Sequence, residues 1–134
     1  MVGRSHQNAR EKGSFMDIHN DLMERLFSFS VNVIKFLRLI PGSPEARVIK
    51  HQLIKAATSG GANYEESQAG ISRREFSMKV AISLKEIREA NYWLRIVDSV
   101  DLIKDDRHTN LIKESDELKS IPGAIVSKMR TTAD

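Results

Sequence analysis

The sequence predicts an all-α protein that folds as an up-down-up-down antiparallel four-helix bundle. Apolar residues recur at alternating spacings of four and three over most of the chain, which is the period of a helix that buries one face. Residues that begin helices follow short breaks in this pattern. Four helices joined by short loops pack in this topology, and a chain of 134 residues is long enough for one such domain.

The apolar period begins after a polar N-terminal segment. Residues 1–16 contain two glycines and no apolar repeat, so we expect a flexible tail there and the bundle domain over 17–134. The first helix is predicted over about 17–40, and Pro41-Gly42 ends it. We call the apolar residues that repeat along the buried face of a helix its seam, and the seam of this helix consists of Leu22, Leu26, Phe29, Val33, Phe36 and Ile40.

Ser43-Pro44 predicts the start of the second helix, over about 44–69, because the Ser hydroxyl can cap the helix and Pro is tolerated at its first position. Gly70 is the expected C-terminal cap. The seam of this helix becomes small and polar after Leu53 and consists of Ile49, Leu53, Ala56, Gly60, Asn63 and Ser67. Gly60 and Gly61 each cost about 1 kcal/mol relative to Ala inside a helix, so we expect close helix packing at this point.

Ser72 and Glu75 form a Ser-x-x-Glu capping box that predicts a third helix over about 73–100. A fourth helix, over about 109–130, contains Pro122-Gly123, which should kink or break it. The third seam is formed by Phe76, Val80, Ser83, Ile87, Ala90, Leu94 and Val97, and the fourth by Leu111, Leu118, Ile121, Ile125 and Met129.

The composition excludes several kinds of protein. Without Cys, the chain has no disulfide scaffold, no thiolate metal site and no Cys nucleophile. No apolar run approaches the roughly 18 residues of a membrane span, and no apolar segment follows the basic residues of the N-terminus as in a secretory signal. We therefore expect a cytoplasmic protein that does not enter a membrane.

We expect neither an enzyme nor a metal or other cofactor. A di-iron bundle needs Glu-x-x-His on two helices, but none of the four His residues has a Glu three positions before it, and Asp105-x-x-His108 falls in a predicted loop. Gly60-Gly61 interrupts a helix instead of forming a phosphate-binding loop after a strand. The Ser and His residues show no arrangement as nucleophile and base.

Polar residues on the second and third helices predict contacts between the two. If these helices are antiparallel about the turn between them, Lys55 lies near Glu86 and Glu89, and Glu66 lies near Lys79. Salt bridges and hydrogen bonds that set the helix register are one interpretation, and a functional polar site is the other. The residues of this polar network are Gln52, Lys55, Asn63, Glu66, Lys79, Glu86 and Glu89.

Positive charge is concentrated in the middle of the chain. Residues 25–95 hold 12 Lys and Arg against 6 Asp and Glu, a balance of +6, whereas residues 96–127 hold 4 against 7, a balance of −3. Folding should bring six cations toward one end of the bundle. They form a candidate nucleic-acid surface, because phosphate contacts need clustered cations; an ordinary solvated face is the alternative. The six are Lys35, Arg38, Arg47, Lys50, Arg88 and Arg95.

The middle of the chain resembles a known bacterial family. The run QLIKAATSGGANYEE extends from Gln52 to Glu66, and further matching residues follow it. Together they are similar to four-helix-bundle proteins encoded in intervening sequences of 23S ribosomal RNA, also called S23 ribosomal proteins. The resemblance implies an all-helical protomer, a pentameric ring and nucleic-acid binding rather than catalysis. The family includes the accessory variability determinant of diversity-generating retroelements, a basic partner of a reverse transcriptase. The further matching residues are Ser72, Phe76, Lys79, Lys85-Glu86, Glu89 and Tyr92-Trp93-Leu94.

Surplus apolar residues also predict self-association, with a wider protomer core as the alternative. We therefore expect a non-enzymatic homo-oligomer, a pentamer by the resemblance, that binds RNA or DNA electrostatically. The alternative function is a protein-interaction scaffold, such as an accessory subunit of a retroelement reverse transcriptase. The surplus residues are Met23, Phe27, Ile34 and Leu37 in a second row of the first helix, and Trp93, Ile96 and Val100 in the third.

Overall fold

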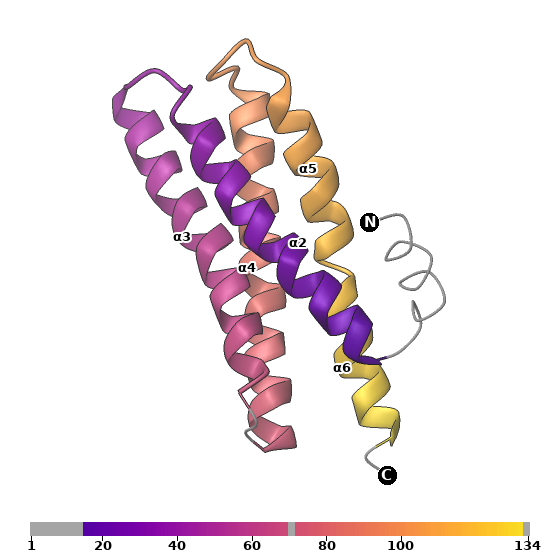
Figure 1. The fold of residues 1–134 in the computed structure, drawn as a ribbon. Helices are drawn as coiled ribbons and strands as arrows, with labels where there is room; N and C mark the ends of the chain where they lie inside the picture. Colours follow the sequence, from indigo (N-terminus) through magenta and orange to yellow (C-terminus); the bar gives the residue numbers. More distant parts are fainter. Residues whose placement is uncertain (1–14, 70–71, 133–134) are drawn as a thin grey trace, which may run out of the picture.

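The computed structural model describes residues 15–69 and 72–132, and the regular structure of this part of the chain is helical (Figure 1). The helices are α2 (Phe15–Leu37), α3 (Pro44–Ser67), α4 (Arg73–Ser99), α5 (Arg107–Leu118) and α6 (Ile121–Thr132). In Figure 1, α5 and α6 continue in one direction as a single interrupted arm. The predicted all-α antiparallel four-helix bundle is therefore confirmed.

Each arm of the bundle packs against two neighbours. α3 packs against α2 and α4, and the arm made of α5 and α6 packs against α4 and α2 (Figure 1). The predicted seams supply most of the core, and Tyr64, which lies outside the predicted seams, is fully buried with them. Buried seam residues are Leu22, Leu26, Phe29, Val33, Phe36, Ile40, Ile49, Leu53, Ala56, Val80, Ile87, Ala90, Leu94, Val97, Leu111, Leu118 and Ile125.

Two helices begin at the serines that the sequence predicts. Ser43 Oγ accepts a hydrogen bond from the N–H of Ala46 at 3.1 Å, and Ser72 Oγ accepts one from the N–H of Glu75 at 3.2 Å. Each bond satisfies a donor that the first turn of a helix leaves unpaired. The cap expected at Gly70 lies outside the residues that the structure describes.

The first helix begins and ends earlier than predicted. Phe15 and Met16 belong to α2 rather than to the tail, and the remaining tail residues, 1–14, lie outside the described part of the chain. At its other end α2 stops at Leu37, because the amides of Leu39 and Ile40 bond to carbonyls three residues earlier and tighten the chain into a turn. Ile40 still reaches the core from this turn.

The last arm breaks where Pro122-Gly123 predicts a break. α5 ends at Leu118 and α6 begins at Ile121, so Pro122 occupies the first turn of α6, where its missing N–H costs no hydrogen bond. The arm predicted over 109–130 is thus two short helices. The side chain of Met129, predicted for its seam, is not among those described.

Candidate nucleic-acid interface

The exposed face of α4 carries a row of cations interrupted by an aromatic ring. Lys85, Arg88, Tyr92 and Arg95 are spaced three, four and three residues apart, so they lie along one side of the helix, and all four are exposed. The guanidinium carbon of Arg95 lies 5.9 Å from the centroid of the Tyr92 ring, which is the distance of a cation–π contact. We call these four residues the α4 stripe.

Packing on both sides of the stripe fixes its position. Ile87 and Leu94, on the opposite face of α4, are fully buried and set the rotation of the helix. Trp93 meets the Tyr92 ring edge to face, with the ring centroids 5.3 Å apart, and its Nε1–H donates to Glu89 Oε2 at 3.3 Å. The aromatic pair is therefore held by contacts within the helix, while Tyr92 remains 48% exposed.

A buried polar cluster between α4 and α5 holds Arg95. The Nε–H of Arg95 donates to Asn91 Oδ1 at 3.1 Å, and Asn91 Nδ2 donates to Ser115 Oγ at 2.8 Å and to Asp116 Oδ1 at 3.1 Å. Asn91 and Ser115 are buried, so these bonds satisfy polar groups that would otherwise be unpaired. A cation anchored in this way loses little side-chain freedom when it contacts a phosphate.

The structure does not bring all six predicted cations to one end of the bundle. Lys35 and Arg38, near the end of α2, and Arg47 and Lys50, near the start of α3, lie at the end where α4 also terminates (Figure 1). Arg88 lies three turns before the end of α4, roughly 16 Å along its axis. The predicted basic end is therefore two surfaces, an end cluster and the α4 stripe, because α4 extends its cations along its length.

Lys50 also has a role in the fold. Its Nζ donates to the carbonyl oxygen of Ile40 at 2.6 Å, and the side chain is half-buried. This bond closes the turn between α2 and α3. Arg88 differs, because within the described residues it has no hydrogen-bond or ion-pair partner, and its charge is available to a ligand.

The predicted polar network forms only in part. Lys79 Nζ and Glu66 Oε2 lie 2.8 Å apart, so this pair joins α4 to α3 as the antiparallel register predicts. Among the described residues, Lys55 forms no ion pair with Glu86 or Glu89. The physical reason is that Lys55 is exposed to water and Glu89 accepts the indole N–H on its own helix.

The two amides of the predicted network do not bridge the helices either. Asn63 Nδ2 donates to the carbonyl oxygen of Ser59 at 2.8 Å and to its hydroxyl at 3.1 Å, one turn earlier in α3. Gln52 is half-buried and has no hydrogen-bond partner within the described part of the chain. These residues therefore do not build a polar site between α3 and α4.

Two buried serines make hydrogen bonds between helices that the sequence does not predict. Ser83 Oγ of α4 donates to Gly60 O of α3 at 2.7 Å, and Ser30 Oγ of α2 donates to Ala57 O of α3 at 3.0 Å. Ser83 stands on the predicted third seam, which is a signal that its hydroxyl is buried. Ser30 lies beside the first seam, and only the packed structure shows what it contacts.

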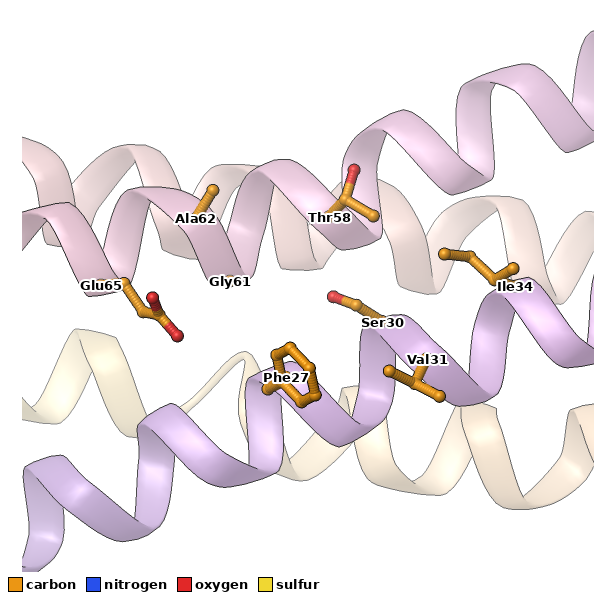
Figure 2. Close-up of a pocket in the computed structure, with 8 residues that line it drawn as sticks. All are labelled: Phe27, Ser30, Val31, Ile34, Thr58, Gly61, Ala62 and Glu65. Atoms are coloured by element: carbon orange, nitrogen blue, oxygen red, sulfur yellow. The ribbon is translucent and has the colours of Figure 1, made fainter.

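An apolar groove lies between α2 and α3 (Figure 2). Its volume is about 330 Å³, and Glu65 is the one charged residue among those that line it. Phe27 is 64% exposed at the groove, whereas two members of the predicted second apolar row, Met23 and Leu37, pack into or against the core. The groove is lined by Phe27, Ser30, Val31, Ile34, Thr58, Gly61, Ala62 and Glu65.

Residues 15–69 and 72–132 contain neither a metal-binding cluster nor a membrane-spanning helix. No three histidine or acidic side chains in these ranges gather closely enough to hold a metal ion. None of the helices in the same ranges is both long and apolar enough to span a bilayer.

The chain is similar to known proteins in both sequence and fold. A sequence model of the 23S rRNA-intervening sequence protein matches residues 19–123. Among solved structures, the chain is similar to a protein of unknown function from the S23 ribosomal protein family of Bacteroides thetaiotaomicron, with a TM-score of 0.74 and 24% sequence identity, covering 82% of this chain and 98% of that chain. At this identity the likeness shows the fold. No curated protein matches the sequence.

Proposed function

The chain belongs to the 23S rRNA-intervening sequence protein family, and from this premise we propose that it is a non-enzymatic, cytoplasmic homo-oligomer that binds RNA or DNA through the α4 stripe. The observation that carries the proposal is the position of Tyr92 between Arg88 and Arg95 on an exposed helix face. Cations bind the phosphate backbone, and an exposed aromatic ring stacks on unpaired bases.

Contacts of this kind do not read base sequence. Phosphate contacts position a protein on nucleic acid, and stacking accepts every base because each has a π-face. We therefore expect binding that depends strongly on salt and weakly on sequence.

A salt-titrated binding assay tests the charged part of the α4 stripe. Fluorescence anisotropy with structured RNA, duplex DNA and an RNA–DNA hybrid would compare Lys85→Gln/Arg88→Gln with the matched control Lys55→Gln/Lys113→Gln, whose lysines are exposed outside the stripe. Removing two phosphate contacts should make the negative slope of log K against log salt on duplex DNA shallower by about 1.8. Equal losses in the two variants, or binding that is insensitive to salt, would refute the proposal.

The aromatic part of the stripe needs a separate variant. Tyr92→Ala removes the exposed ring and leaves the charges of the stripe in place. Its affinity for single-stranded RNA should fall about tenfold, because base stacking on an aromatic side chain is lost. Affinity for duplex DNA, whose bases are already stacked, should change little.

The groove of Figure 2 supports the oligomeric part of the proposal, and we propose as its occupant the first half of α4 of a second copy, which precedes the α4 stripe. Met78 is 56% and Ile82 38% exposed on α4, which gives that helix an apolar patch of its own. Arg74, one turn before Met78, is opposite in charge to Glu65 at the groove. The groove and the patch are different surfaces, so the contact is heterologous and can close into a ring; a pentamer is the closed form we propose.

The same groove also favours a second candidate function. If the isolated chain is monomeric, the apolar groove is left for a different protein. The chain would then be an interaction scaffold, such as an accessory subunit of a retroelement reverse transcriptase. The mass of the isolated chain in solution separates the two candidates.

A further inference from the structure

A second cleft, between α2 and α5, differs in chemistry from the apolar groove. Its volume is about 270 Å³. Each wall contributes one cation and one carboxamide three residues apart, and the floor is apolar. The walls are Asn32 and Lys35 of α2 and Arg107 and Asn110 of α5, and the floor is Phe36 and Leu111.

The directions of the two helices order these groups along the cleft. α2 ends and α5 begins at the same end of the bundle (Figure 1). Lys35 and Arg107 therefore lie nearer that end, and Asn32 and Asn110 lie about 4.5 Å farther along the helix axes. One half of the cleft is cationic, and the other offers uncharged hydrogen-bond donors and acceptors.

These polar groups are not used by the fold. Within residues 15–69 and 72–132, neither Lys35 nor the carboxamides of Asn32 and Asn110 have a hydrogen-bond or ion-pair partner. Arg107 Nε lies 3.3 Å from Asp105 Oδ2, but the Arg107 side chain is still 66% exposed. With two cations against one carboxylate, this half of the cleft retains positive charge.

We propose that the α2–α5 cleft binds one unpaired nucleotide, with its phosphate between Lys35 and Arg107 and its base against the carboxamides of Asn32 and Asn110. The volume is close to the lower bound of about 300 Å³ for small-molecule pockets, which suits a single nucleotide and excludes a duplex. Because Asn pairs bidentately with the N6 and N7 edge of adenine, adenine is the preferred base.

Two ligands can present this nucleotide with the same chemical groups. It is either part of a single strand, in which case the inference rests on the proposed function, or a free mononucleotide. The test therefore uses four probes, which are short oligoadenylate RNA, oligouridylate RNA, duplex RNA and adenosine monophosphate. Binding of the strands is measured by anisotropy and binding of the mononucleotide by calorimetry.

Charge and carboxamide variants of the cleft have matched controls elsewhere. Lys35→Gln is compared with Lys55→Gln, and Asn110→Ala with Asn63→Ala, whose carboxamide bonds only within α3. Both cleft variants should bind oligoadenylate about tenfold more weakly and keep the affinity of the parent chain for duplex RNA. Lys35→Gln should weaken binding of oligouridylate equally, because a phosphate contact does not depend on the base, whereas Asn110→Ala should lose less affinity for oligouridylate than for oligoadenylate. Both controls should behave like the parent chain, and circular dichroism checks that every variant is folded.

Each outcome decides the inference. Equal losses on single-stranded and duplex RNA, or no loss in Lys35→Gln and Asn110→Ala, would overturn it. Mononucleotide binding that these variants abolish supports the cleft with a free nucleotide as ligand, whereas losses confined to strands support it with nucleic acid as ligand. The proposed function is judged separately, by Lys85→Gln/Arg88→Gln on duplex DNA, so either can fail without the other.

Discussion

Gly60 of α3 lies so close to Ile87 of α4 that a methyl group on Gly60 would be 2.5 Å from Ile87 Cδ1 and 3.0 Å from its Cγ1. Ile87 is fully buried, so its side chain has little space into which to move. The neighbouring Gly61 is different, because a methyl group there would lie at ordinary contact distance, 3.5 Å from Ser30 Oγ. Close helix packing therefore requires only the first of the two glycines.

We expect Gly60→Ala to destabilise the protein although Ala is the better helix former. Overpacking a buried site costs about 1–3 kcal/mol, whereas the gain in helix propensity is about 1 kcal/mol, so the free energy of unfolding should fall by about 1 kcal/mol. Gly61→Ala should instead raise it by up to about 1 kcal/mol. Urea unfolding of the two variants measures both changes.

A double-mutant cycle identifies the clashing atom. Ile87→Val removes Cδ1 and alone should cost about 0.5–1.5 kcal/mol. In the Gly60→Ala background the same change should cost less, because it also relieves the contact. Strictly additive costs would show that the two side chains do not clash.

The buried carboxamide of Asn91 should contribute more to the free energy of unfolding than the carboxamide of Asn63 on α3. Asn91→Ala removes two donors and one acceptor of the α4–α5 cluster and should lower the free energy of unfolding by about 1–3 kcal/mol. Asn63→Ala removes a carboxamide that bonds within its own helix, and should change it by less than about 0.5 kcal/mol. Thermal unfolding compares the pair, and similar losses would contradict the role given to Asn91.

Local features of this fold could be predicted from the sequence, and contacts between distant segments could not. The seam positions of Val33 and Leu94 follow from the period of a single helix, and Ser43 bonds within its own first turn. The bond from Asn91 to Ser115 depends on how closely two arms approach, which no local pattern specifies.

In the candidate site too, positions on one helix could be predicted from the sequence, and contacts between helices could not. Spacing alone places Arg88 and Arg95 on one face of a helix. The α2–α5 cleft was not foreseen, because Lys35 and Arg107 come together only when segments far apart in the chain are packed. The helix register predicts that Lys55 lies near Glu86 and Glu89, but a register does not specify whether a long side chain turns to its neighbour or to water.

Burial of Tyr64 predicts a loss of stability in alkali. Burial raises the pKa of its phenol above the ordinary value of 10.0. Below pH 10 both folded and unfolded chains keep this proton. Above it the unfolded chain loses the proton while the folded chain retains it, so stability falls as pH rises, by about 1.4 kcal/mol per pH unit until the folded state also ionises.

Urea unfolding at several pH values from neutral to alkaline tests this prediction. Lysines also titrate in alkali, so the comparison that matters is with Tyr64→Phe, which has no phenolic proton. Its stability should fall less steeply with pH than that of the parent chain. Equal slopes above pH 10 would show that Tyr64 ionises as readily in the folded state as in the unfolded one.

The proposed heterologous contact between copies predicts an unusual result on mixing. Phe27→Glu places a charge in the α2–α3 groove and leaves the α4 patch intact, whereas Met78→Glu does the reverse. Each variant alone should be monomeric by light scattering, because every contact needs one groove and one patch. A mixture contains one intact groove and one intact patch on different chains, and it should therefore form dimers that grow no further.

Val48→Glu is the matched control, since Val48 is 57% exposed on α3 and does not line the groove. This variant should keep the oligomeric mass of the parent chain. A two-fold contact, in which both copies use the same surface, would leave one of the two variants dimeric on its own, and mixing would then form no new dimers. If the parent chain is already monomeric, a second copy does not occupy the groove, and the result favours a different protein as its partner.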